Sequence, residues 1–216
     1  MRKALIGVAA GVVALVGVSV TVVAMQPAET HVERSLVVAA TPADLWPLVS
    51  DFRQFPTWSP WQDMDPTQKS TFSDPATGVG AWYAWEGNDD VGSGKMTYTA
   101  LEPEAKVTED LEFITPFESK AVVVTSLVPV EGGTKVTWGF TSPNNFMAKA
   151  FGLFVDMDTM LGKDFEKGLG KLSEKAVVAA AARAEAEKRA AQAAAAEAAA
   201  PADPIATAAA PAMTTP

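Results

Sequence analysis

Residues 119–175 read SKAVVVTSLVPVEGGTKVTWGFTSPNNFMAKAFGLFVDMDTMLGKDFEKGLGKLSEK, and this stretch decides the fold class. Its first part holds two runs rich in Val and Thr, residues 119–130 and 134–141, separated by Glu131-Gly132-Gly133. Such a short link joins antiparallel neighbours, because parallel strands need a crossover of about a dozen residues. After Asn145, large apolar residues recur at helical spacing. The stretch therefore predicts a β-hairpin followed by a long amphipathic helix.

Alternation of apolar and polar residues predicts further strands upstream of this hairpin. A strand over residues 32–38 is followed by a short helix that starts at Thr41-Pro42-Ala43-Asp44, and then by an aromatic loop over residues 51–65. The remaining strands are expected over residues 69–73, 81–86, 94–101 and 106–113. We therefore predict an α+β domain in which a curved antiparallel sheet of about seven strands packs on the C-terminal helix.

The helix expected over residues 146–175 carries one apolar stripe, which must lie on an apolar surface. The stripe contains Met147, Phe151, Phe154, Leu161, Phe165, Leu169 and Leu172. Asp158 falls near its middle, where an ionised carboxylate is costly unless it is paired. Its partner is a ligand, a cavity water, Tyr83, Tyr98 or a basic side chain. The carboxylate is thus either satisfied by neighbouring protein groups or available to a ligand.

The N-terminal segment is uncharged from Ala4 to Met25 and is preceded by Arg2 and Lys3. About 20 apolar residues cross a bilayer as a helix, and a basic flank stays cytoplasmic. We therefore expect residues 1–26 to anchor the chain in a membrane by a single pass, with the domain outside the cytoplasm. Cleavage of the same segment as a signal peptide, near Val22-Val23-Ala24, is the alternative and would export the domain.

The C-terminal segments differ from the domain in composition. Residues 176–200 are mostly alanine, which favours a solvent-exposed helical extension because alanine has high helix propensity but buries little. Residues 201–216 repeat Pro, Ala and Thr, which is typical of disorder. The predicted organisation is an anchor over residues 1–26, a domain over 27–175, the extension and the tail.

Composition excludes several function classes. The formal net charge of −9 opposes contact with phosphate backbones, so no nucleic-acid partner is expected. The chain has no Cys, which removes thiol nucleophiles and Cys metal sites, and its single His, His31, is read as an exposed linker residue. The acidic pairs Asp63/Asp65 and Asp89/Asp90 lack the ligand-rich loop of a calcium site. We expect no metal and no cofactor.

Several motifs resemble the polyketide cyclase/dehydrase and lipid-transport family, also called SRPBCC or START-like proteins. They are Trp58-Ser59-Pro60-Trp61, Trp85-Glu86-Gly87-Asn88, Gly133-Thr134-Lys135-Val136-Thr137-Trp138 and Gly162-Lys163-Asp164-Phe165-Glu166. The resemblance covers about residues 31–175 and implies a helix-grip fold with a cavity between the sheet and the long helix. It implies functions that range from lipid carriers and hormone receptors to aromatic cyclases.

Side chains that face such a cavity would contact the ligand. By strand and helix periodicity we expect ligand contacts from Tyr83, Trp85, Tyr98, Phe113, Trp138, Phe151, Phe154, Asp158 and Leu161. Ordinary core packing is the alternative for each aromatic residue. Asp158 and Glu86 are the candidate acid–base residues, with a surface position as the alternative for Glu86.

These observations leave three hypotheses for function. The leading one is a membrane-anchored binding protein that takes a lipid or other hydrophobic small molecule into its cavity. The second is a cyclase/dehydrase-like or hydrolase-like enzyme in which Asp158 or Glu86 moves protons without a metal or nucleotide. The third is an interaction protein whose cavity is filled by side chains. The sequence contains no signal for a particular oligomeric state.

Overall fold

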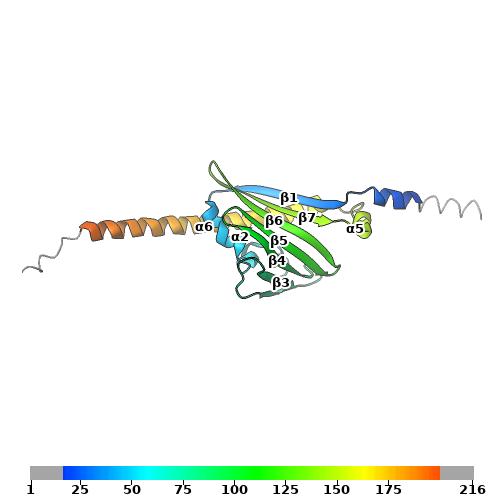
Figure 1. Ribbon diagram of the computed structural model, residues 1–216, viewed down its shortest axis with the longest axis horizontal. Helices are drawn as coiled ribbons and strands as arrows, with labels where there is room; N and C mark the ends of the chain where they lie inside the picture. The colour runs from blue at the N-terminus through cyan, green and yellow to red at the C-terminus, as the bar shows by residue number, and fades with distance from the viewer. Residues whose placement is uncertain (1–16, 200–216) are drawn as a thin grey trace, which may run out of the picture. The chain divides into compact units, whose positions relative to one another are not determined.

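A seven-stranded antiparallel sheet forms the centre of the computed structural model, which describes residues 17–199 (Figure 1). Its strand order is β1-β7-β6-β5-β4-β3-β2, so the last six strands form a meander. The predicted sheet is therefore confirmed, with strand ends that shift by a few residues. The strands are β1 (Glu29–Val38), β2 (Lys69–Phe72), β3 (Trp82–Glu86), β4 (Ser93–Glu102), β5 (Lys106–Thr115), β6 (Ser119–Val130) and β7 (Gly133–Pro143).

The first strand joins the sheet beside the last one. β1 pairs with β7 in a register that runs from Glu29 opposite Pro143 to Val38 opposite Thr134. Gly133 allows the close approach at the end of this ladder. Its φ is 146°, and a Cβ atom there would collide with the Val38 carbonyl group.

Helices α2 (Pro42–Ser50), α3 (Phe55–Trp58) and α4 (Trp61–Met64) connect β1 to β2. α2 begins at the predicted position with a capping box: the Asp44 amide donates to the Thr41 hydroxyl, and the Thr41 amide donates to the Asp44 carboxylate. The aromatic loop forms α3 and α4, which Ser59 and Pro60 separate. The Trp58 indole donates a 2.9 Å hydrogen bond to the Leu48 carbonyl oxygen, which joins the loop to α2.

The predicted helix over residues 146–175 is wrong in one respect, because the chain forms two helices there. α5 (Phe146–Phe151) ends at Gly152, and α6 (Met157–Ala199) begins after a turn. Asp156 caps α6 by accepting a 3.1 Å hydrogen bond from the Thr159 amide. The interruption resets the helical phase, so residues before it do not continue the apolar stripe of α6.

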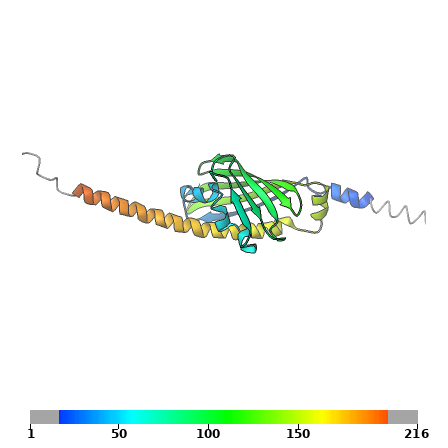
Figure 2. The same cartoon turned by 90° about the horizontal axis from the view of Figure 1, so that it is seen from below.

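The core lies between the concave face of the sheet and α6 (Figure 2). Strand side chains such as Tyr83, Met96 and Trp138 face Phe165, Leu169 and Leu172 of α6, and all are at most 4% exposed. Alternation along each strand produces this face, because every second side chain points inward. The stripe of α6 is therefore confirmed from Leu161 onward.

The chain divides into two compact units, residues 1–180 and residues 181–216. The first holds the sheet and every buried residue of the core. In the second, residues 181–199 are helical, and Arg183 and Arg189 pair along the helix with Glu187 and Glu185. The predicted tail over residues 201–216 lies outside the described residues.

The predicted membrane anchor lies mostly outside the described residues as well. Residues 17–24 of it are described and are helical. Within residues 17–199, no helix combines the length and the apolar character needed to span a bilayer. The anchor stays a prediction.

Candidate functional site

A cavity of about 220 Å³ lies between the concave face of the sheet, the aromatic loop and the beginning of α6. Its polar lining is confined to Ser59, Gln68, Asp90 and the hydroxyl of Tyr83. The other lining side chains are apolar or aromatic: Phe55, Trp61, Trp85, Val91, Met96, Leu111, Phe113, Val123, Trp138, Phe140, Met157, Leu161 and Phe165. Pockets for drug-sized ligands measure about 300–1,000 Å³, so this cavity suits a more compact apolar molecule or one hydrocarbon chain.

Ring stacking fixes the wall formed by β7 and α6. Trp138 and Phe165 are stacked with centroids 4.2 Å apart, and Trp61 approaches Trp138 edge-on at 5.7 Å. Gly168 leaves room for this arrangement, because a Cβ atom at that position would lie 2.7 Å from the Trp138 ring. Gly168 is thus a packing requirement of the wall.

Two lysines of α6 hold the aromatic loop in place. The Asp63 carboxylate of α4 forms ion pairs with the ammonium groups of Lys171 and Lys167, with N–O distances of 2.8 Å and 2.9 Å. The Lys171 ammonium, followed by that of Lys167, holds the pKa of the Asp63 carboxyl below its usual value. Lys171 also donates to the Ser59 carbonyl oxygen at 3.2 Å. These contacts keep the loop over one end of the cavity.

A small polar group interrupts the apolar lining at Tyr83. Gln68 donates to the Tyr83 hydroxyl at 3.2 Å, and the Ser70 hydroxyl lies 3.4 Å from it. Burial raises the pKa of Tyr83, so its hydroxyl stays protonated at neutral pH. The buried Oε1 atom of Gln68 has no hydrogen-bond partner among the described residues. The cavity therefore has one polar side and a long apolar wall.

The structure brings five of the residues expected to contact a ligand into the cavity lining. These are Tyr83, Trp85, Phe113, Trp138 and Leu161. Four come from alternate positions on strands β3, β5 and β7, and Leu161 comes from the second turn of α6. Strand parity is therefore the signal that located the four strand residues, and helical spacing located Leu161.

Tyr98 lies outside the lining. Its ring stacks on Phe52 at 3.8 Å, and its hydroxyl donates to the Val49 carbonyl oxygen at 3.1 Å. Burial raises its pKa. Tyr98 is therefore a core residue that joins the sheet to the end of α2.

Phe151 and Phe154 point to solvent rather than into the cavity. Phe151 is 57% exposed at the end of α5, and Phe154 is 87% exposed in the turn that follows. The expectation for both rested on an unbroken helix, and the turn before α6 removes its basis.

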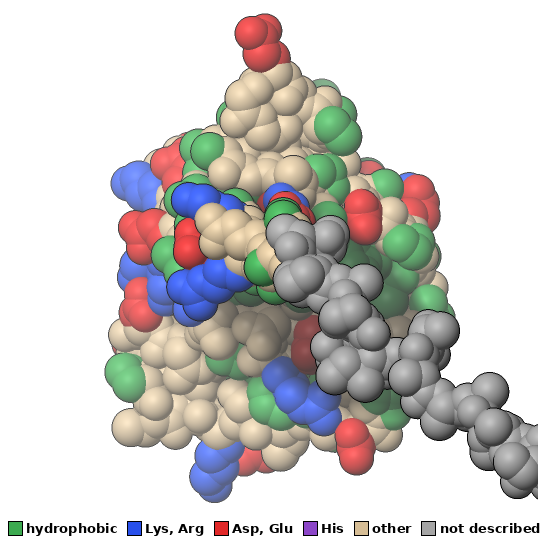
Figure 3. Space-filling model, turned by 90° about the vertical axis from the view of Figure 1, so that its left-hand side faces the viewer, with side chains coloured by type: hydrophobic (Ala, Val, Ile, Leu, Met, Phe, Trp, Pro, Cys, Tyr) green, Lys and Arg blue, Asp and Glu red, His purple; other side chains and the backbone are tan. Residues whose placement is uncertain are grey.

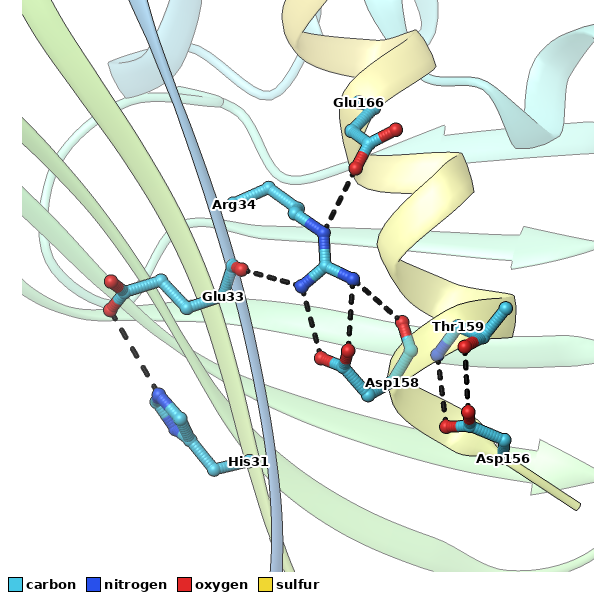
Figure 4. Close-up of polar contacts among 7 residues, drawn as sticks. All are labelled: His31, Glu33, Arg34, Asp156, Asp158, Thr159 and Glu166. Carbon is cyan, nitrogen blue, oxygen red and sulfur yellow. Dashed lines mark hydrogen bonds and ion pairs between the residues drawn. The ribbon is translucent and has the colours of Figure 1, made fainter.

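Asp158 lies at the solvent-exposed beginning of α6, not inside the cavity (Figure 4). Its carboxylate forms a two-pronged ion pair with Arg34 of β1, with both N–O distances 3.0 Å. The Arg34 guanidinium holds the pKa of the Asp158 carboxyl below its usual value. Arg34 also donates to Glu166 at 3.0 Å. The basic partner that the sequence left open is thus Arg34.

Glu86 is exposed at the end of β3 and does not line the cavity. Neither carboxylate that the sequence nominated for acid–base chemistry therefore faces the enclosed space. His31, the predicted linker residue, is part of β1, where its ring nitrogen Nδ1 lies 2.9 Å from the Thr141 hydroxyl.

Sequence reasoning missed one buried carboxyl, Glu109. It is 6% exposed. Burial raises its pKa to about 8, so the side chain is mainly neutral at pH 7. On β5 it alternates with the inward-facing Val107 and Leu111, and this parity was the available signal.

Residues 29–177 match the family described as polyketide cyclase/dehydrase and lipid transport. This match spans well over half of the 216 residues. The chain belongs to this family. The cavity between the sheet and α6 is thus that of a polyketide cyclase/dehydrase and lipid-transport domain. No curated protein matches the chain by sequence.

Solved structures share the fold of this polyketide cyclase/dehydrase and lipid-transport domain at low sequence identity. An uncharacterised protein from Rhizobium leguminosarum is 13% identical with a TM-score of 0.52, over 68% of this chain and 94% of its own. The Mll3558 protein from Rhizobium loti is 14% identical with a TM-score of 0.52, over 68% and 96%. Ara h 8.0201 is 13% identical with a TM-score of 0.50, over 69% and 99%. These similarities establish the fold alone.

Proposed function

We propose that this domain binds a compact hydrophobic molecule, or one hydrocarbon chain of a lipid, in the cavity between the sheet and α6. The observation that carries the proposal is the cavity itself, whose wall is apolar and aromatic apart from a few polar groups. Burial of apolar surface would drive binding, at about 25 cal/mol for each Å² removed from water. The Tyr83 hydroxyl and Gln68 amide would orient a polar group of the ligand.

We further propose that the N-terminal segment holds the domain at a membrane, with the domain on the non-cytoplasmic side. The uncharged segment Ala4–Met25 and the preceding Arg2 and Lys3 support this placement. A membrane-held binder would draw its ligand from, or deliver it to, the adjacent lipid. Protease added to sealed vesicles of known orientation tests the topology, because only an outward-facing domain is cut.

The acid–base alternative has less support. Asp158 is committed to Arg34, and Glu86 is exposed outside the cavity. Glu109 is deeply buried but is not among the lining residues. We therefore favour binding over catalysis.

Native mass spectrometry of the full chain, extracted from its membrane, tests the binding proposal. Leu161→Trp would fill the cavity from α6, and Met160→Trp is the matched control, because Met160 is 52% exposed and outside the lining. We expect a defined added mass on the wild type and on Met160→Trp that is lost from Leu161→Trp. An absence of added mass from all three chains, even after incubation with a total lipid extract, would refute the proposal.

A further inference from the structure

The end of the domain that carries α5 exposes several large apolar side chains. Phe146 is 51% exposed, Met147 74%, Phe151 57% and Phe154 87%. Phe117, in the turn between β5 and β6, is 81% exposed. We call these five residues the apolar end. Contiguous exposed apolar side chains of this size mark surfaces that bind a partner or a membrane.

Strand registers place the β5–β6 turn and α5 at the same end of the sheet. Val122 of β6 lies opposite Thr141 of β7, so Phe117 and the chain leaving β7 for α5 are on one side. The Ser142 hydroxyl donates to the Lys120 carbonyl oxygen at 2.8 Å, which closes this end. Phe117 therefore lies at the same end of the sheet as α5.

The predicted anchor reaches the domain at this same end. Lys149 of α5 donates to the Ala24 carbonyl oxygen at 3.4 Å. The Asn144 backbone amide donates to the Ala28 carbonyl oxygen at 2.7 Å. The Asn144 side-chain amide donates to the Pro27 carbonyl oxygen at 3.2 Å. The helix over residues 17–24 thus meets the domain beside α5, as Figures 1 and 2 both show.

The lining of the cavity also extends to this end. Its lining includes Asp90 and Val91 from the β3–β4 turn and Met157 from the first turn of α6. Register places that turn beside Thr115 of β5, because Ser93 lies opposite Thr115. Met157 follows Phe154 closely in the chain. The apolar end and this part of the cavity lining therefore lie at the same end of the domain.

We infer that the apolar end inserts into the interfacial layer of the same bilayer that the N-terminal segment enters. The occupant of this surface is a lipid bilayer, because an uncharged stretch of chain long enough to span one ends beside it. Insertion would cover the exposed Phe and Met side chains and bring this end of the cavity close to lipid. The inference deepens the proposed function and rests on it, since a cavity whose lining ends near lipid serves a hydrophobic ligand.

The charges around the apolar end specify the kind of bilayer. Four acidic side chains, Asp89, Asp90, Glu118 and Asp156, are exposed there, against Lys149 of α5 and Lys120 of β6. Anionic headgroups would be repelled, so apolar burial rather than charge would drive insertion. By contrast, the face in Figure 3, on the side of the molecule away from α5, presents Lys and Arg side chains next to Asp and Glu, with hydrophobic side chains scattered between them.

Spin labels on single cysteines test the inference in the full chain, which has no natural Cys. The variants are Phe117→Cys, Met147→Cys and Phe154→Cys, with Val79→Cys as the control. Val79 is 66% exposed in a turn next to the Asp51–Thr77 bridge, near the end of α2. Each labelled chain is reconstituted in phosphatidylcholine vesicles, and collisions with oxygen and with a water-soluble nickel complex are measured.

We expect the oxygen-to-nickel collision ratio at positions 117, 147 and 154 to exceed that at position 79 severalfold. Adding the anionic lipid phosphatidylglycerol should lower the ratio at these three positions, because the acidic side chains nearby would be repelled. Equal ratios at all four positions would overturn the inference, and so would spin–spin broadening at position 147 or 154, which would identify a second copy as the occupant. These labels report insertion whether or not the cavity binds a ligand. A chain that inserts but carries no ligand therefore contradicts only the proposed function.

Discussion

Arg34 donates to both carboxylate oxygens of Asp158 and also to the Asp158 carbonyl oxygen, each at 3.0 Å. The pair joins the edge strand β1 to the beginning of α6, two elements whose paired residues are 124 positions apart in the sequence (Figure 4). A planar guanidinium donates to both oxygens of a carboxylate at once, whereas a lysine ammonium would act as a single point charge. The relationship gives Asp158 a structural role at the helix start.

Replacing Arg34 with Gln should raise the pKa of the Asp158 carboxyl toward its ordinary 3.8, because the donor that stabilises the charged form is lost. In the wild type, the pair contributes stability above pH 3.8, and this contribution is lost as the pH falls through the lowered pKa. NMR titration of the Asp158 side chain measures the shift. Arg53→Gln, which breaks a separate pair with Asp74, is the control and should leave it unchanged.

Asp158→Ala should leave ligand binding in the cavity close to that of the wild type. The carboxylate is engaged with Arg34, and its side chain is 59% exposed. Native mass spectrometry of the variant should show the same added mass as the wild type. Loss of that mass, with thermal unfolding unchanged, would put Asp158 back in contact with the ligand.

Ionisation of Glu109 should make the domain less stable as the pH rises. Its pKa is about 8 in the folded domain against an ordinary 4.5, so the folded state holds the proton more tightly between these values. Its contribution to stability is complete below pH 4.5 and is lost as the pH rises through about 8, with a slope of up to about 1.4 kcal/mol per pH unit. Denaturant unfolding of wild type and Glu109→Gln across this range measures the difference. Parallel pH profiles would contradict the assignment.

Two glycines of α6 should respond to alanine with opposite signs. At Gly170 a Cβ atom meets nothing within 4 Å, so Gly170→Ala should stabilise the domain by up to about 1 kcal/mol through helix propensity. At Gly168 it would press on the Trp138 ring and on Pro60. Gly168→Ala should therefore destabilise the domain and, since Trp138 lines the cavity, alter its shape. Thermal unfolding of the two variants compares them directly, and equal shifts would refute the packing role of Gly168.

Asp65 should control the mobility of the β3–β4 turn. Its carboxylate accepts hydrogen bonds from the Thr67 hydroxyl at 2.7 Å, the Thr67 amide at 3.0 Å and the Asn88 amide at 2.8 Å. These donors, the Thr67 hydroxyl first, hold its pKa below the usual value. Asp65→Ala should accelerate amide hydrogen exchange at Asn88 and in the turn that carries Val91. Asp89→Ala, an exposed change in the same turn, is the control.

The fold followed from sequence because its signals are local and redundant. Gly132-Gly133 and the alternation on either side of it define the β6–β7 hairpin, and Thr41 with Asp44 defines the start of α2. Strand parity also located Tyr83, Trp85, Phe113 and Trp138 on the concave face. These patterns depend on nearest neighbours in the chain, so they are readable without knowledge of the tertiary structure.

The rest of the site depended on contacts between distant segments. A helical wheel assigns a direction to Asp158 but contains no information about Arg34, which is 124 residues away. The same wheel assumed one helix through Gly152, so it turned Phe151 and Phe154 inward. Two residues close together in the sequence were the local signal that would have corrected this wheel: Gly152 is typical of a helix end, and Asp156 is typical of the cap of a new helix. Tyr98 faces inward as parity requires, but α2 and Phe52 cover it.

The pairing of β1 with β7 sets the order in which the domain can fold. Thr30 and Asn144 are hydrogen-bonded at 2.9 Å although 114 residues separate them. Closing so long a loop costs entropy before any contact repays it, so the domain should fold slowly for its size. The first strand to leave the ribosome has no partner until nearly the whole domain has been synthesised. The sheet of this topology is therefore completed only when β7 has emerged, at the end of the domain's own synthesis.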